Sequence, residues 1–180
     1  MKLLRTIRAD ASDTFVFERA AEPGEWAVSG AFAFARANPE ALERKARAAF
    51  RSGFLSVSSL GWSTLAEIVE ASEEDRLRGI DILATQLLAH FGAPDLGTAR
   101  LAAEEEIGFV ASLCSHPTGT LTAVSRNTED GSIREMFRAL GPNAGSGPMR
   151  VFDVVEVVGD DEEAQTGNID PPAPAEGDRR

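Results

Sequence analysis

The sequence predicts an α+β fold, a single domain over residues 1–158 in which a mostly antiparallel sheet has about three helices packed on it. Two long segments with apolar residues at helical spacing follow each other in the middle of the chain, and segments with alternating apolar and polar residues lie on both sides of them. This order lacks the regular alternation of strand and helix that a doubly wound parallel sheet requires. We therefore expect an antiparallel sheet with the helices on one side.

The N-terminal segments show the alternation of strands. In TFVFE (residues 14–18), Phe15 and Phe17 would lie on one side, and EWAVSG (residues 25–30) repeats the pattern with Trp26 and Val28. The EPGE segment between them has the residues of a tight turn, which predicts that the two strands pair as a hairpin. MKLLRTIR, residues 1–8, predicts a third strand.

The first predicted helix covers residues 38–53. Asn38 stands at its N-cap, Pro39 at its first position and Gly53 near its C-cap. Its apolar face contains Leu42, Ala46, Ala49 and Phe50. Residues 54–58 and 62–69 predict a second hairpin that turns near Gly61, although STLAEIVEA, residues 63–71, also fits a helix.

The two best-marked helices come next. Ser72 is a predicted N-cap followed by three acidic residues, which favour the positive end of a helix dipole, and Gly92 marks the end of this helix. Its expected buried face contains Leu77, Ile80, Ala84, Leu87 and Phe91. A further helix is expected over residues 97–114.

Three strands complete the predicted domain, over residues 118–126, 132–140 and 149–158. NTEDG forms the turn between the first two, and GPNAGSGP (residues 141–148) forms a loop before the last. From residue 159 onward the chain has seven acidic residues, three prolines and one large apolar residue. Such a segment buries too little apolar surface to fold, so residues 159–180 are predicted to be a disordered acidic tail.

The composition narrows the function classes. A net charge of −11 argues against nucleic acid and against an anionic membrane as partners, because both are bound by clustered Lys and Arg. A single cysteine allows no internal disulfide, which favours a reducing cytoplasm. The first residues lack the apolar core of a signal peptide, and no apolar segment approaches the ~20 residues needed to span a bilayer.

That cysteine, Cys114, lies two positions before His116 and raises the question of a nucleophile with its base. Cys114 shares helical spacing with Ile107 and Val110, which predicts a buried thiol at the wrong helix end for activation. Pro117 disfavours helical geometry at His116, so the histidine is expected to cap the end of the helix. We treat both residues as weak reactive candidates with a structural role favoured.

No sequence motif predicts a metal site or a cofactor. The chain has three Cys and His residues in total, fewer than a structural zinc site requires, and it lacks the EF-hand, phosphate-loop and nucleophile-elbow patterns. We therefore expect no cofactor and name no catalytic residue.

One cationic feature is a candidate for binding an anion or a partner. Arg44, Arg47 and Arg51 recur on one face of the first predicted helix. The alternative is an ordinary solvated face on which these arginines pair with Glu40 and Glu43. A second, weaker set contains Arg126, Arg134 and Arg138, which fall on neighbouring predicted strands.

Four segments together resemble a small bacterial domain family of unknown function: GEWAVSGAFAFA (24–35), FRSGFLSVSSLGWSTL (50–65), EEEIGFVASLC (104–114) and IREMFR (133–138). The likeness covers about residues 1–158 and provides no site residue to transfer. Genes of that family often lie near those of a molybdenum-dependent formate dehydrogenase and a biotin- or lipoate-ligase-like protein. The resemblance thus implies an accessory role in metabolism or cofactor assembly.

Two functional hypotheses follow. The first is a non-catalytic accessory domain in the cytoplasm that binds a protein partner. The second is a small enzyme or binding protein for an anionic metabolite, which would use the arginines of the first helix, Cys114 or His116. The sequence identifies no interface for a homo-oligomer.

Overall fold

The computed structural model describes residues 1–141 and 153–157, and its elements form an α+β domain as predicted. One sheet in the order β4-β3-β2-β1-β5-β6-β7-β8 contains the strands β1 (Lys2–Ile7), β2 (Trp26–Val28), β3 (Phe54–Ser56), β4 (Trp62–Ser63), β5 (Leu65–Glu70), β6 (Leu121–Glu129), β7 (Ser132–Gly141) and β8 (Asp153–Val157). All neighbouring strands in this sheet are antiparallel. The helices are α1 (Ser12–Val16), α2 (Arg44–Ser52), α3 (Glu73–His90) and α4 (Leu96–Leu113), with the 3-10 turns η1 (Ala31–Phe34) and η2 (Pro39–Ala41).

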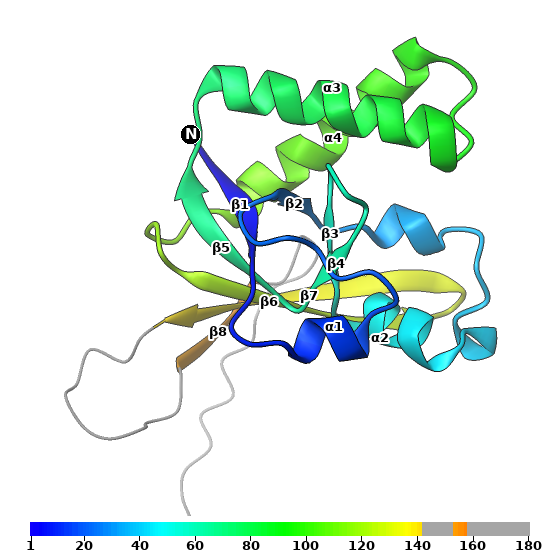
Figure 1. Ribbon diagram of the computed structural model, residues 1–180, viewed down its shortest axis with the longest axis horizontal. Coiled ribbons are helices and arrows are strands. Elements are labelled where there is room, and N and C mark those ends of the chain that lie inside the picture. Colours follow the sequence, from blue (N-terminus) through cyan, green and yellow to red (C-terminus); the bar gives the residue numbers. More distant parts are fainter. Residues whose placement is uncertain (142–152, 158–180) are drawn as a thin grey trace, which may run out of the picture.

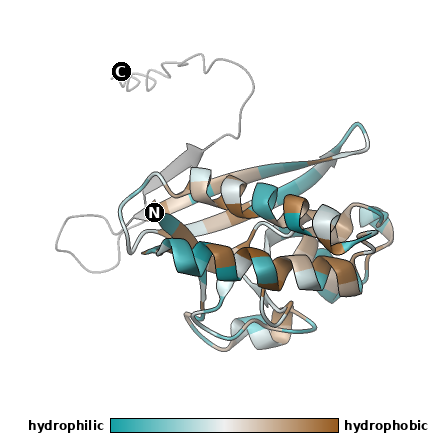
Figure 2. Cartoon of the chain, turned by 90° about the horizontal axis from the view of Figure 1, so that it is seen from above, coloured by the Kyte–Doolittle hydropathy of each residue, from teal (hydrophilic) through white to brown (hydrophobic). Residues whose placement is uncertain are grey.

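The sheet is strongly curled. Phe54 of β3 and Phe137 of β7 are separated by four strands in the sheet order, yet their ring centroids are 6.3 Å apart. Helices α3 and α4 pack against each other and lie together over the sheet (Figures 1 and 2), with Phe109 of α4 placed 5.6 Å from Phe137. The main core therefore lies between this helix pair and the inner face of the curl.

A second, smaller core lies on the other side of the molecule, near α1 and α2 (Figure 1). It contains Phe17, Phe34, Ala49 and Phe50, and the rings of Phe34 and Phe50 meet edge to face at 5.4 Å. This core holds α2 against the sheet and so positions the arginines of that helix.

The predicted strand over residues 14–18 is wrong, and so is its hairpin. This segment overlaps the short helix α1, in which Phe15 is 76% exposed, and Phe17 follows α1 fully buried in the second core. A tertiary contact holds this helix, because the Asp13 carboxylate accepts hydrogen bonds from the backbone N–H and the hydroxyl of Thr64. Strand β2 pairs instead with β1 and β3.

The helix predicted over residues 38–53 is interrupted. Asn38 does act as a cap, but its side chain accepts from the Glu40 N–H and caps only the η2 turn. Leu42 then adopts an extended conformation, and α2 begins at Arg44. The predicted end is confirmed, since the Gly53 N–H donates to the Ala49 carbonyl at the C-terminus of α2.

Predictions for the middle of the chain are confirmed with small shifts. The predicted second hairpin is confirmed only near its turn, where β3 pairs with β4. Residues 65–70 form a separate strand, β5, rather than a helix, and this strand pairs with β1 and β6. Ser72 caps α3 in a reciprocal capping box with Asp75, and α4 ends beside Cys114. On α3, Leu83 is buried, whereas Leu77 is 39% exposed.

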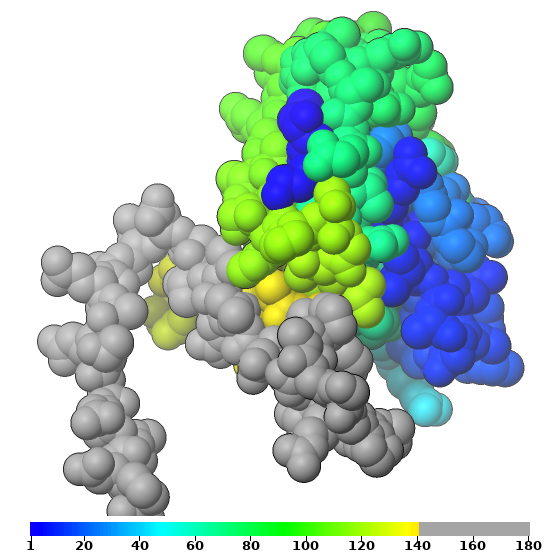
Figure 3. All heavy atoms as spheres, turned by 90° about the vertical axis from the view of Figure 1, so that its left-hand side faces the viewer, coloured from blue at the N-terminus to red at the C-terminus, as the bar shows by residue number. Residues whose placement is uncertain are grey.

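The N-terminus is fixed between two later segments. The Met1 carbonyl accepts from the Ala71 N–H, and the Lys2 ammonium donates to the His116 carbonyl at 2.5 Å. In Figure 3 the first residues (blue) accordingly lie between the chain near residue 70 and the chain near residue 115. This contact joins the start of β1 to the ends of β5 and α4.

Strands β6 and β7 form a long hairpin at the predicted place, with Asp130 and Gly131 both at positive φ in its turn. Strand β8 falls within the predicted last strand. The predicted loop over 142–148, the beginning and end of that last strand, and the predicted acidic tail over 159–180 lie outside the described residues.

Candidate functional site

The three arginines predicted as a binding face lie on α2. Arg44, Arg47 and Arg51 are all exposed, while Ala49 and Phe50 on the other side of the helix are buried in the second core. We refer to Arg44, Arg47 and Arg51 as the cationic α2 surface. The predicted amphipathic division of this helix is therefore present in the structure.

A cavity of about 410 Å³ lies between α2 and β6. It is lined by Pro39, Glu40, Arg47, Phe50, Arg51, Arg126, Asn127 and Thr128, so one carboxylate lies among its walls. Arg44 is not part of this lining, so the structure brings two of the three predicted arginines to the cavity. The cavity adds two neutral hydrogen-bonding side chains, those of Asn127 and Thr128, which the sequence did not single out.

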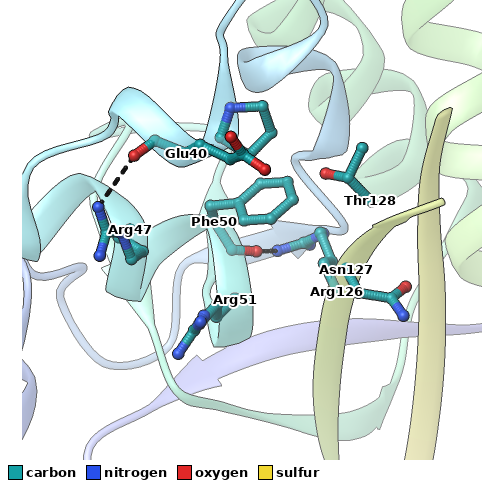
Figure 4. A pocket seen from close by; sticks show the side chains of 8 residues that line it. Glu40, Arg47, Phe50, Arg51, Arg126, Asn127 and Thr128 are labelled. Atoms are coloured by element: carbon teal, nitrogen blue, oxygen red, sulfur yellow. Dashed lines mark hydrogen bonds between the residues drawn. The ribbon is translucent and has the colours of Figure 1, made fainter. Parts of the chain in front are cut away.

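The two arginines do not converge on the polar side chains of β6. Figure 4 shows the Phe50 ring between Arg47 on the α2 side and Thr128 on the β6 side, with the Arg51 guanidinium pointing away from Thr128. A small anion is held best by donors that converge on it. The positive charge on α2 is instead spread along the exposed helix.

The expected pairing of these arginines with acidic neighbours is not present. The Arg47 guanidinium donates to the carbonyls of Glu40 at 3.1 Å and Leu42 at 2.9 Å, both neutral acceptors (Figure 4 shows the first). Among the described residues, no ion pair joins Arg44, Arg47 or Arg51 to a carboxylate within 4.0 Å. The charge of this surface is thus uncompensated at close range.

Arg126 lies behind the cavity with a fully buried side chain. Its Nη1 donates to the carbonyls of Phe50 at 3.0 Å and Gly53 at 2.8 Å, with a longer contact to Ala49 at 3.4 Å. Its Nη2 donates to the carbonyl of Ser29. The guanidinium therefore caps the C-terminus of α2, where unpaired carbonyls and the negative end of the helix dipole favour a cation.

Two carboxylates accompany this buried cation. Glu135 accepts from Arg126 Nε at 2.6 Å and from the Ser29 hydroxyl at 2.5 Å. Glu106 of α4 accepts from the Gly30 N–H at 3.3 Å, and burial, followed by the charge of Glu135, raises the pKa of Glu106. Burial lowers the pKa of Arg126, but a guanidinium stays charged in proteins. The hydrogen-bonding groups of this cluster bind one another and the backbone. The cluster therefore has a structural role, and it connects α2, α4, β2 and the β6–β7 hairpin.

The sequence contained part of the signal for this cluster. Glu135 shares one side of the predicted strand with Ile133 and Phe137, and Glu106 falls three positions after Ala103 on the buried side of α4. The weaker set of three arginines is divided by the structure, because Arg126 is buried whereas Arg134 and Arg138 are exposed.

Cys114 and His116 are not brought together as a reactive pair. Cys114 is buried at the end of α4, its thiol donates to the Val110 carbonyl, and burial raises its pKa to about 11. Within the described residues no hydrogen bond links this thiol to His116 or the imidazole to the helix end. The expected imidazole cap is therefore not observed, and the His116 backbone carbonyl instead accepts a hydrogen bond from the Lys2 ammonium.

In the part of the chain that the structure describes, no group of three or more His, Cys, Asp and Glu side chains is arranged to hold a metal ion. The helices in that part are also too short or too polar to cross a membrane.

Fold and site together define an α+β protein with a curled antiparallel sheet and an uncompensated cationic helix at one side of it. The model of DUF6505, a family of unknown function, matches residues 1–155, and the chain belongs to this family. No curated protein and no solved structure matches the chain.

Proposed function

We propose that the protein is a non-catalytic binding domain that holds an acidic segment of a protein partner against the cationic α2 surface. The observation that carries this proposal is the lack of any carboxylate within 4.0 Å of Arg44, Arg47 and Arg51 among the described residues. In a chain with a net charge of −11, such a surface is a place where a negatively charged partner meets little repulsion.

The shape of the surface supports a partner segment. Arg44, Arg47 and Arg51 follow one another along consecutive turns of α2, so an extended acidic segment can contact them in series. The buried Arg126 cluster and the second core hold α2 in place beneath them. Because the backbone of α2 is fixed in this way, binding has to order only the arginine side chains.

A small anionic metabolite is the second candidate ligand, and the cavity of about 410 Å³ beside Asn127 and Thr128 favours it. The divergence of Arg47 and Arg51 in Figure 4 weighs against it, because a small anion in the cavity would meet few charged donors at once. We therefore place the partner segment first.

The biological setting that we propose is an accessory role in the cytoplasm, beside a metabolic or cofactor-dependent enzyme. The resemblance that suggested formate dehydrogenase and biotin- or lipoate-ligase-like proteins supports this setting by association. Under this proposal, one of those enzymes or an assembly factor for it carries the acidic segment.

The proposal is tested by affinity capture from native lysate with a charge-matched pair of variants. Arg44→Glu with Arg51→Glu reverses the charge of the surface and spares Arg47, whose guanidinium supports the backbone before α2. Arg78→Glu with Arg134→Glu makes the same charge change at exposed sites elsewhere. We expect wild type and control to capture one stoichiometric partner that the first variant loses. Capture of no stoichiometric partner, or equal capture by both variants, would refute the proposal.

A further inference from the structure

Two neighbouring cavities on the other side of α2 share two wall residues, Leu60 and Phe91. The first has a volume of about 250 Å³, and the second, more polar one has a volume of about 690 Å³. Neither includes a residue of the cationic α2 surface in its lining. An inference from these cavities is therefore independent of the proposed function.

The first cavity has aromatic and apolar walls. Phe34, Trp62 and Phe91 line it together with the small side chains of Ala46 and Ala49. The rings of Phe34 and Trp62 are 5.3 Å apart, and the indole of Trp62 is only half-buried. Since an apolar cavity of about 150 Å³ accommodates a benzene ring, this one has room for a ring with a short substituent.

The second cavity offers positive and hydrogen-bonding groups. Its lining includes Arg19, Ser58, Gln86 and His90 and has no carboxylate. The Arg19 guanidinium donates to the neutral carbonyl of Ser59 at 2.9 Å, and no ion pair with a carboxylate is formed by it in the described residues. A bound carboxylate would supply the missing negative charge.

Leu60 is held between the two cavities by its backbone. It adopts φ +55°, a left-handed conformation that L-residues other than glycine rarely take. The turn is fixed by the Ser56 hydroxyl, which accepts from the N–H groups of Ser58 and Ser59, and by the Gln86 amide, which donates to the Ser58 carbonyl. The strained residue thus places an apolar side chain where the apolar and polar cavities meet.

We propose that the two cavities form one binding site for a small aromatic carboxylate, an arylalkanoate. The ring lies among Phe34, Trp62 and Phe91, and the carboxylate extends past Leu60 to the Arg19 guanidinium. Lys45 and Glu18 line the first cavity as well, and their opposite charges leave the apolar compartment without a net preference for an anion. The selectivity for a carboxylate therefore comes from Arg19.

The test uses 3-phenylpropionate as the probe and 3-phenylpropanol as its neutral counterpart, with Trp62 fluorescence as the readout. We expect saturable binding of the carboxylate to the full chain, at least about tenfold tighter than binding of the alcohol, because charge-assisted hydrogen bonds are the stronger ones. Arg19→Gln should reduce this discrimination to about twofold or less, whereas Lys45→Gln and the distant Arg78→Gln should preserve it. Trp62→Phe should remove the signal, because the other tryptophan of the chain, Trp26, lines neither cavity.

Ala46→Leu provides a second test, because the larger side chain fills the apolar compartment. Its urea unfolding curve establishes that it is folded, and it should lose binding of both probes. Equal affinity for the acid and the alcohol would overturn the proposal, as would discrimination lost in Lys45→Gln instead of Arg19→Gln. The absence of saturable binding to the wild-type chain would also overturn it.

Discussion

At the scale of single residues, the guanidinium of Arg126 connects parts of the chain that lie far apart in the sequence. It reaches carbonyls at the end of α2 and at the end of β2 while its own strand pairs with the strand of Glu135. A buried ion pair of this kind need not add net stability, but removal of one partner leaves the other charge unpaired. The cluster is therefore most sensitive to truncation of Arg126.

We predict that Arg126→Met destabilises the fold by about 3 to 5 kcal/mol, because it leaves the partly buried Glu135 without its cationic partner and the α2 carbonyls without their donor. Urea unfolding measures this loss. Arg134→Met is the control, since Arg134 is exposed on the next strand, and its removal should cost less than about 1 kcal/mol. Similar costs for the two variants would show that the Arg126 cluster does not fasten the fold.

Glu106 gives the protein a pH dependence of known sign. Because burial raises its pKa in the folded state, the folded chain binds this proton more tightly than the unfolded chain. Its contribution to stability is then greatest below the ordinary pKa of glutamate and declines as the pH rises through the ordinary value to the raised one. Glu106→Gln should remove that decline and unfold at higher urea concentration than wild type at neutral pH. Glu105→Gln, an exposed neighbour, should follow wild type across the same pH series.

Cys114 is predicted to be inert in the folded protein. Its pKa of about 11 leaves little thiolate at neutral pH, and thiolate is the form that iodoacetamide alkylates. Alkylation should be at least ~100-fold slower than that of a model thiol and should reach the model rate in urea. Reaction of the folded protein at the model rate would restore Cys114 as a reactive candidate.

At the scale of elements, the close approach of β2 to its neighbours depends on one glycine. Gly30 has φ +79°, and a Cβ there would lie 2.6 Å from the Leu55 Cβ and 3.0 Å from the Trp62 ring. Gly131 in the β6–β7 turn has nearly the same φ, +78°, but a Cβ added there would meet no atom within 4 Å. An alanine at Gly131 therefore meets backbone strain alone, whereas an alanine at Gly30 meets the same strain and a steric clash.

Gly131→Ala should therefore cost about 1 to 2 kcal/mol, the backbone cost of the left-handed region alone. Gly30→Ala should cost a further ~1 to 3 kcal/mol, because the added methyl group overpacks the contact with Leu55 and Trp62. Thermal or urea unfolding of the two variants compares them directly. A smaller loss for Gly30→Ala than for Gly131→Ala would contradict the described packing of β2 on β3.

The elements that the sequence predicted well are those with local signals. Residues close together in the sequence carry each of these signals: the Ser72 cap, the apolar periodicity of the two long helices and the Asp130–Gly131 turn. The N-terminal errors arose from tertiary contacts that no local pattern records. Phe15 and Phe17 alternate like a strand, but Asp13 binds Thr64, and Phe17 enters a core built from residues 34–50.

The candidate site was predictable only in part, for the same reason. Helical spacing placed Arg44, Arg47 and Arg51 together on one exposed face, which the structure retains. The cavity between α2 and β6 depends on a packing of residues 39–51 against 126–128, and sequence spacing carries no information on that contact. Arg126 looked like one of several surface cations, and only its burial distinguishes it.

At the scale of the whole molecule, the helices are divided between two cores with different tasks. Helices α3 and α4 cover the main core on one side, and the second core holds α2 on the other side with its arginines exposed (Figure 1). The protein is acidic overall, so its cationic α2 surface stands out against the net charge of −11. Binding there should weaken as salt is added, because exposed charges are screened over about 10 Å at ordinary ionic strength.

The most direct test of binding at the cationic α2 surface is an amide-resolved NMR titration of the full chain with a short oligoglutamate peptide. We expect salt-sensitive chemical shift changes centred on residues 44–51, lost in Arg44→Glu with Arg51→Glu and retained in Arg78→Glu with Arg134→Glu. Shift changes centred on α3 and α4, or a response that survives reversal of the α2 charges, would contradict this expectation.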